Sequence, residues 1–300
     1  MVWKITRSLL IYVLILLGFA LLLLLPREIK ITHLYDRVFE AEYPFTIDLF
    51  KQNISSFIDH IRTAKGLGTI KTGMKVSEHT ILVFNRSIKI IFSCFIASIA
   101  GGVVIGSLLF RFKEKGVGKI LNVLNWLFSS IPDFFMYIAF QYMLIKLIVA
   151  GMPDFNLYGN ENWYSFIFPA VALMLFPTAF VAKYIASSLT YESKQDYVRT
   201  SIAKGMSELH ILLHMLRNSA AGLLHQTQLV MLYILTSLPI IEKLSNYRGA
   251  GYYLLESILT NQDAQALALM IPFLFLMTVV ITLVKILKPK LIPVHGGEMR

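Results

Sequence analysis

His210 and His214 come nearest to a chemical site by residue type and spacing. They are four residues apart, so they would share one face of a helix, and that spacing can hold zinc. The general-base glutamate of an HExxH site is missing, because Ile211 follows His210. A polar helix face is therefore the favoured interpretation over a metal site, and no metal is expected. Three more histidines lie in the polar stretch near the N-terminus, where solvated surface is expected: His33, His60 and His79.

The stretch GVGKI, residues 116–120, is the nearest approach to a nucleotide-binding loop. A phosphate-binding loop needs GxxxxGK followed by Ser or Thr, and here both the glycine spacing and the hydroxyl residue are missing. The chain is therefore not expected to hydrolyse ATP. No set of serine, histidine and acid stands out, and no pair of carboxylates lies within the apolar segments, so no catalytic residue is proposed.

The composition indicates a membrane protein. Of 300 residues, 56% are hydrophobic and only 15% are charged, and the mean hydropathy is +0.64, which is too apolar for a soluble domain of this length. The net charge of +10 could suggest nucleic acid, but the basic residues form short clusters beside apolar runs, as a membrane topology requires. Nucleic acid is therefore not expected as a partner. Cys94 is the single cysteine, so no disulfide can form within the chain.

Six runs are long enough to cross the hydrocarbon core, which takes about 20 apolar residues. They are residues 8–25, 88–110, 120–150, 166–185, 222–241 and 266–287. The second run contains GGVVIG, whose small residues would let a neighbouring helix approach closely. The third is too long for one straight span and contains Pro132, which should break or kink it. One bent helix and a broken pair both fit this run.

The distribution of lysine and arginine predicts the orientation. Among the short loops, positive residues gather at the N-terminus, at 111–119, at 194–217 and at the C-terminus, which places these segments and both termini in the cytoplasm. The predicted organisation is an N-terminal transmembrane helix (1–25), an external region (26–87), a transmembrane core (88–288) and a cytoplasmic tail (289–300).

Residues 190–220 form a charged segment between two apolar runs. Tyr191, Val198 and Ile202 would share one face of a short helix. A second helix would follow with the spacing i, i+3, i+4, i+7 at Leu209, Leu212, Leu213 and Leu216. Gly205 suits the left-handed end of the first helix, and Ser207 could cap the second. This predicts a helix-turn-helix that another protein could contact, although a basic amphipathic hairpin lying on the lipid surface is an alternative.

The letters of this segment resemble the cytoplasmic loop of permease subunits of ABC importers, in the branch that carries peptides and nickel. The family writes this loop as EAA, three residues, Gly, nine residues and I-x-L-P. Aligned on Gly205, this chain has Arg199-Thr200-Ser201 and Met215-Leu216-Arg217-Asn218 at those places. The family-wide letters are mostly absent. The positions that look like the peptide branch's own version are Asp196, Tyr197, Arg199, Ala203, Lys204, Gly205, Arg217 and Asn218.

Three further stretches extend the resemblance from about Leu67 onward. GLGTIKTGMKVSEHTILVFNRSIKI is similar to the family's segment before the second helix, and SSIPDFF to its S-S-I-P element. IEKLSNYRGAGYYLLESILTNQD is similar to the external stretch E-x-x-F-x-W-P-G-L-G through N-R-D. Tyr247 and Arg248 replace Trp-Pro there, and Ala250 replaces Leu. The first helix lacks the P-G-D-P that usually follows it.

The resemblance implies an all-α integral membrane protein with about six transmembrane helices and a cytoplasmic coupling loop at 190–220. It implies three partners besides the bilayer: an ATP-binding subunit, a second permease subunit, more usually a different chain, and an extracellular solute-binding protein. ATP and Mg would then bind the partner ATPase, and this chain would hold no cofactor. Leu209 and Leu213 join the residues listed above as expected contacts of the ATPase.

Polar residues inside the predicted spans are the candidates for a solute path, because they are costly in lipid. These are Gln141, Gln226 and Gln228, although hydrogen bonds between helices would explain them equally well. The solute expected from the resemblance is a peptide or a metal chelate, moved by alternating access. An ion-gradient-driven transporter and a scaffold or regulatory subunit remain as alternatives, and Pro132 alone supports the former.

Overall fold

The computed structural model describes residues 2–27, 30–35, 38–42, 45–64, 66–70, 72–153 and 158–291. The chain divides into two compact units. Unit 1 comprises residues 1–85 and 253–274, and unit 2 comprises residues 86–252 and 275–300. Each unit is described by itself below.

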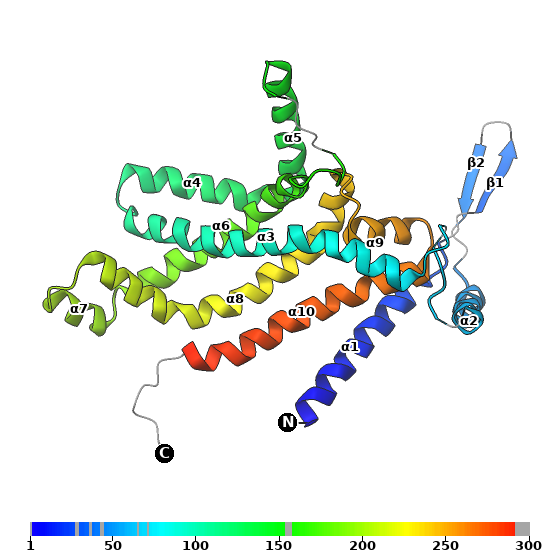
Figure 1. Cartoon of the computed structure of the whole chain (residues 1–300), viewed down its shortest axis with the longest axis horizontal. Coiled ribbons are helices and arrows are strands. Elements are labelled where there is room, and N and C mark those ends of the chain that lie inside the picture. Colours follow the sequence, from blue (N-terminus) through cyan, green and yellow to red (C-terminus); the bar gives the residue numbers. More distant parts are fainter. Residues whose placement is uncertain are drawn as a thin grey trace. The chain divides into compact units, whose positions relative to one another are not determined.

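Unit 1 contains the first helix and the polar stretch that follows it (Figure 1). Helix α1 spans Val2–Leu23 and helix α2 spans Ile47–Thr63, which Thr46 caps by accepting a hydrogen bond from the Leu49 N–H. Between them lies an antiparallel hairpin, with β1 (Lys30–Tyr35) paired to β2 (Val38–Glu42). The predicted helical fold is thus confirmed with one addition, since the sequence analysis did not anticipate this hairpin.

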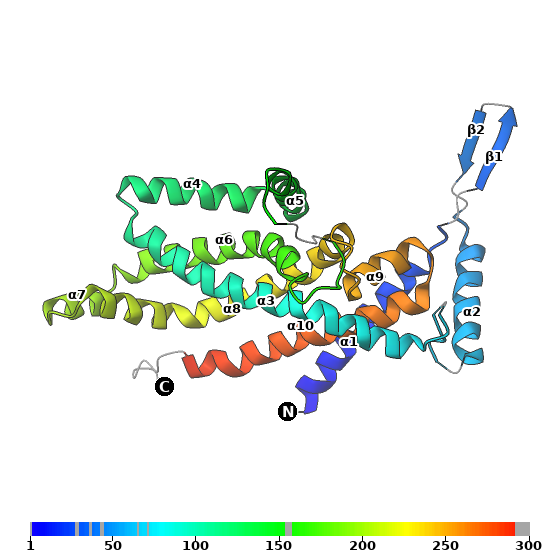
Figure 2. The same ribbon diagram turned by 45° about the horizontal axis from the view of Figure 1, so that its top comes forward.

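Helices α3 (Val76–Arg111), α9 (Ala250–Leu259) and α10 (Asp263–Leu291) each contribute residues to both units. Unit 2 also holds α4 (Gly116–Ser130), α5 (Asp133–Val149), α6 (Ile167–Glu192), α7 (Asp196–Ala203) and α8 (Glu208–Leu244). Among them α6 is central, because it contacts α4, α5 and α8 (Figure 2).

Four helices in the described residues are long and apolar enough to cross a membrane: α3, α6, α8 and α10. The pair α4 and α5 adds a fifth span if it is counted as one, and its two helices meet at a 109° bend. The break falls at Ile131 and Pro132, so the third predicted run is a broken pair rather than one bent helix. The predicted total of six spans, which includes α1, stays a prediction.

The glycines of GGVVIG pack against α6, as the sequence predicts. A Cβ on Gly102 would lie 2.5 Å from Val181, and one on Gly106 would lie 2.6 Å from the carbonyl oxygen of Ala182. Neither distance leaves room for a methyl group, so the two helices come close because these positions carry no side chain.

Two helices extend beyond the apolar runs that the sequence predicts. Helix α3 begins at Val76, twelve residues before the predicted start at 88. Helix α8 joins the second helix of the 190–220 segment and the span 222–241 into one helix of 37 residues. Nothing between Asn218 and Gly222 stops a helix: Ser219 bonds back to the Met215 carbonyl within it, and Gly222 makes room for the ring of Tyr184. At 1.5 Å per residue α8 is about 55 Å long, so it extends well beyond a hydrocarbon core of about 30 Å.

Candidate functional site

Gly205 makes the turn between α7 and α8. Its φ of +73° lies in the left-handed region that the sequence predicts for it. The Gly205 N–H donates to the carbonyl of Ile202 at 2.9 Å, and the Met206 N–H donates to that of Ser201 at 3.2 Å. These two bonds form a Schellman motif, which closes the C-terminus of α7. A Cβ at Gly205 would meet nothing within 4 Å, so the backbone conformation, not space, selects glycine here.

Helix α7 is held against its neighbours by Tyr197. Its hydroxyl donates to Oε2 of Glu192 at 2.6 Å, and its ring contacts the ring of His214 with 4.8 Å between centroids. Burial, together with the bond to Glu192, raises the pKa of Tyr197 to about 12, so the hydroxyl keeps the proton that it donates. Val198 on α7 and Met215 on α8 are buried. Helix α7 is therefore packed against its neighbours, while the turn residues 204–207 are exposed.

Three large apolar side chains on α7 and α8 are exposed: Ile202, Leu209 and Leu213, with exposed fractions of 61%, 62% and 54%. We call these three residues the apolar tip. Around it stand exposed charged residues, Arg199, Lys204 and Arg217, of which Arg199 forms an exposed ion pair with Asp196 at 3.4 Å. Isolated apolar side chains on a surface need no explanation, whereas these three lie close in sequence on the two sides of one turn.

The residues predicted on this segment thus divide into two groups. Tyr197 holds the turn from within, and Asn218 is half-buried. The remaining positions are at the surface: Asp196, Arg199, Ala203, Lys204, Leu209, Leu213 and Arg217. The predicted face of four leucines is only partly correct, because the buried side of α8 is centred on Met215 and Ser219. Ser207 precedes α8 as predicted but does not cap it, and its hydroxyl instead bonds Nδ1 of His210 at 2.7 Å.

A polar stripe lies on α5 directly after the Pro132 break. Asp133, Tyr137 and Gln141 are spaced by four residues and share one helix face. Oδ2 of Asp133, the hydroxyl of Tyr137 and Nε2 of Gln141 are buried and make no well-formed hydrogen bond among the described residues, although Tyr137 faces the side chain of Ser245 and Asp133 faces that of Tyr233. A buried polar group without a full partner costs about 1–3 kcal/mol, so these three positions keep hydrogen-bonding capacity for water, a ligand or another chain.

The other two predicted path residues, Gln226 and Gln228, are half-buried on α8. Neither amide has a hydrogen-bond partner among the described residues, so the described residues give no support to the alternative that they bond between helices. The structure does not bring them into a shared cluster with Gln141.

Glu242 is a buried residue that the sequence analysis did not single out. It is fully buried on α8, where Oε1 accepts from the hydroxyl of Ser87 at 2.5 Å and Oε2 accepts from the Tyr252 N–H at 2.9 Å. Ser87 in turn accepts from the Ala250 N–H at 2.7 Å. The carboxyl group thus ties α8, α3 and the start of α9 together. In the sequence Glu242 is a lone acid at the end of an apolar run. It aligns with the Glu of E-x-x-F-x-W-P-G-L-G.

The histidines do not assemble a metal site. Among the described residues no group of three or more His, Cys, Asp or Glu side chains is placed to hold a metal. The surface prediction for His79 is wrong: the residue is 8% exposed, its ring packs edge-on against Tyr253, and Nδ1 lies 3.4 Å from Nε2 of Gln265. His60 is exposed as predicted. The side chain of His33 lies outside the described residues.

Comparison with known proteins gives consistent matches. The family described as "Binding-protein-dependent transport system inner membrane component" matches residues 98–293. The dipeptide transport system permease protein DppB of Bacillus subtilis is 28% identical over 179 residues, 58% of this chain and 56% of that protein. The glutathione transport system permease protein GsiC of Salmonella choleraesuis is 23% identical over 203 residues, 67% of this chain and 65% of that protein.

The chain thus matches between half and two thirds of the length of these relatives. A solved structure shares the fold: the inward-facing MetNI methionine ABC transporter matches with a TM-score of 0.53 and 15% identity, over 71% of this chain and 94% of that one.

Proposed function

The chain belongs to the inner membrane components of binding-protein-dependent transport systems, and from this premise we propose that it imports peptides or a related small solute with energy from a separate ATPase. The family consists of multi-pass membrane subunits of ABC transporters, so the chain belongs in the cell membrane. It is a transport component and not an enzyme.

The observation that carries the proposal is the apolar tip at the turn before the N-terminus of α8. Ile202, Leu209 and Leu213 are exposed where the Schellman motif at Gly205 holds them. Burying three such side chains against a partner would contribute several kcal/mol at about 25 cal/mol per Å² of apolar surface. Lys204 and Arg217 near the tip favour a partner surface with acidic residues, whereas Arg199 is already paired with Asp196. The ATP-binding subunit is the occupant that we assign to this surface.

The continuity of α8 supplies the mechanical link. One helix runs from Glu208, beside the turn, to Leu244, and carries Glu242 near its far end. Because α8 is continuous from the turn up to Pro239, displacement of the turn by ATPase closure would shift this part of the helix, and Pro239 would be the point at which it can bend. Its anchors through Glu242 to Ser87 and the start of α9 would pass that shift to other helices. Alternating access then follows as a rocking of packed helices.

The solute path that we propose includes the polar stripe on α5. Asp133, Tyr137 and Gln141 present buried groups without well-formed hydrogen bonds among the described residues, and Gln226 and Gln228 add amides on α8. Such groups suit a solute with many hydrogen-bonding atoms. The names of the relatives, a dipeptide and a glutathione permease, favour a peptide over a metal chelate.

Further partners follow from membership in the family. We propose that a second permease subunit, a different chain, completes the path, and that an extracellular solute-binding protein delivers the solute. ATP and Mg would bind the ATPase subunit, and this chain would hold no cofactor.

The test is recovery of the ATPase with the detergent-solubilised full-length chain, read by mass spectrometry and by ATP hydrolysis of the recovered complex. Gly205→Val is expected to lose the ATPase, because a β-branched residue resists positive φ. Gly205→Asn is the matched control, since asparagine adopts the left-handed conformation more easily.

Loss with valine and retention with asparagine would support coupling through the turn. Equal recovery of the ATPase with all three proteins would remove Gly205 from the interface. Recovery of no ATPase with the unaltered chain would favour a gradient-driven transporter or a scaffold instead.

A further inference from the structure

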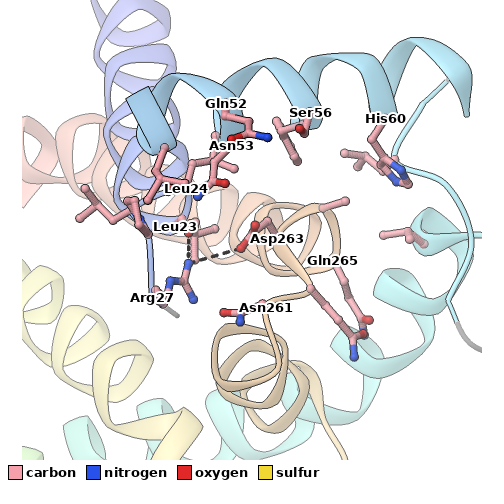
Figure 3. A pocket seen from close by; sticks show the side chains of 18 of the residues that line it. Leu23, Leu24, Arg27, Gln52, Asn53, Ser56, His60, Asn261, Asp263 and Gln265 are labelled. Atoms are coloured by element: carbon pink, nitrogen blue, oxygen red, sulfur yellow. Dashed lines mark hydrogen bonds and ion pairs between the residues drawn. The ribbon is translucent and has the colours of Figure 1, made fainter. Parts of the chain in front are cut away.

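Unit 1 contains a cavity of about 710 Å³ that the transport path described above does not use. It lies between the end of α1, one face of α2 and the turn that joins α9 to α10 (Figure 3). From α2 it is lined by Gln52, Asn53 and Ser56, and from the opposite side by Asn261, Asp263 and Gln265. Cavities of 300–1,000 Å³ are the usual size for small-molecule sites.

The charges in this cavity neutralise one another. Arg27 lies 3.3 Å from Oδ1 of Asp263, and its guanidinium also donates to the carbonyls of Ile258, at 2.7 Å, and of Leu23. Among the described residues these two are the only acidic and basic side chains that line the cavity, apart from His60. Within this described lining a phosphate, a free cation or an acidic ligand would find no unpaired counter-charge, which favours a neutral ligand.

The remaining polar lining is mostly amide. Asn53 donates to the Leu24 carbonyl at 3.1 Å, which leaves its amide oxygen as an acceptor, and Gln265 bonds with His79. The side chains of Gln52, Ser56 and Asn261 are exposed and have no hydrogen-bond partner among the described residues, so they are free to bond to water or to a ligand. An amide side chain both donates and accepts hydrogen bonds. Several of them around one space complement a ligand that alternates N–H and C=O groups.

Apolar side chains provide the other half of the lining. Leu23, Leu24 and Val76 are nearly fully buried, and Leu49, Phe57 and Ile70 complete this side. Such a surface suits the carbon atoms of short side chains rather than a polyhydroxylated ring. The cavity thus offers neutral hydrogen bonding on one side and apolar contact on the other.

We propose that this cavity binds the backbone of a short peptide through the amide and hydroxyl side chains of Gln52, Asn53, Ser56 and Asn261. This inference rests on the proposed function for its choice of a peptide, and it adds a site on the side that the charge pattern predicts to be external. Because Arg27 and Asp263 are already paired with each other, the site should bind the backbone amides of the peptide and not its charged ends. A peptide with blocked ends should bind as well as a free one.

The test uses the purified full-length chain in lipid nanodiscs and two probes, trialanine and N-acetyl-trialanine amide, with Kd measured by calorimetry. Both peptides are expected to bind with the same Kd. Ser56→Trp is expected to abolish binding, because the indole fills the cavity. Gln52→Leu should weaken binding about fivefold, the equivalent of one hydrogen bond.

Ser55 provides a matched control, because it neighbours Ser56 on α2 but does not line the cavity. Ser55→Trp should leave Kd within a factor of about two. If Ser55→Trp and Ser56→Trp weaken binding equally, if only the free peptide binds, or if maltose displaces the blocked peptide, the assignment is wrong. Gel filtration shows whether the Ser56→Trp protein folds. If it does not, the Kd of the Gln52→Leu protein decides the test.

The two proposals can fail separately. ATPase recovery is measured on the same preparations and does not depend on this cavity. Recovery of the ATPase without blocked-peptide binding would overturn only the site, whereas binding without an ATPase would overturn the coupled importer and leave the site standing.

Discussion

The carboxyl group of Glu242 and the hydroxyl of Ser87 lie 2.5 Å apart, both fully buried and 155 residues apart in the chain. A Cβ on Gly249 would collide with both groups, so the turn after α8 approaches them only because residue 249 is glycine. No lysine or arginine forms an ion pair with Glu242 in the described residues. Its oxygens instead accept hydrogen bonds from the Ser87 hydroxyl and the backbone N–H of Tyr252.

Ser87→Ala should therefore destabilise the fold. It removes a donor to Glu242 and the acceptor of the Ala250 N–H, which leaves buried polar groups without partners, at a cost of about 1–3 kcal/mol. Thermal unfolding of the detergent-purified chain measures this loss. Ser107→Ala is the control, because its hydroxyl bonds only to the Val103 carbonyl of its own helix. Equal melting temperatures for the two variants would contradict the anchoring role.

Close packing of α3 on α6 predicts opposite results at two adjacent glycines. Gly102→Ala should destabilise the protein by about 1–3 kcal/mol, because its Cβ would lie 2.5 Å from Val181. Gly101→Ala should be neutral or stabilising by up to about 1 kcal/mol, because its Cβ meets only Thr178 at 3.4 Å and alanine favours a helix. Denaturant titration in detergent compares them. Similar losses at both positions would mean that the close approach is absent.

Local sequence signals predicted much of this fold. The apolar runs in α3, α6, α8 and α10, the break at Pro132, the small residues at Gly102 and Gly106, and the left-handed Gly205 all depend on a residue's immediate neighbours, and the structure has each of them. The boundaries were less predictable. The 190–220 segment changes from polar to apolar near Gly222, yet α8 continues through it, because a helix responds to the absence of a stop signal rather than to the polarity of its surroundings.

The candidate site was predictable only in part, because its remaining contacts are long-range. The Glu242 and Ser87 pair needs two helices to meet, and nothing local in either stretch states its partner. The stripe of Asp133, Tyr137 and Gln141 has a readable spacing of four. Which side of α5 is buried, however, depends on how α5 packs after the 109° bend.

Replacement of Tyr137 by phenylalanine separates structure from transport. Its hydroxyl is buried beside Ser245 without a well-formed hydrogen bond among the described residues, so Tyr137→Phe should change the melting temperature little. If the stripe contacts the solute, peptide uptake by the assembled transporter should fall about fivefold. Tyr142→Phe on the exposed side of α5 should change neither quantity. Unchanged uptake with Tyr137→Phe would assign the stripe to buried water.

The apolar tip predicts that polar substitutions there weaken assembly without unfolding the chain. Leu209 and Leu213 are exposed, so the double change Leu209→Ser and Leu213→Ser should leave the melting temperature within a degree or so. Each leucine buried against the ATPase would contribute about 1–2 kcal/mol, so the pair should weaken the complex at least about tenfold. Val123→Ser is the control, since Val123 on α4 is as exposed as Leu209, at 62%.

The measurement is ATPase recovered per permease over a range of salt concentrations. A loss with Leu209→Ser and Leu213→Ser that grows with salt would indicate that Lys204 and Arg217 supply the remaining attraction, because salt screens exposed charges. Equal recovery with the tip variant and Val123→Ser would remove the apolar tip from the interface.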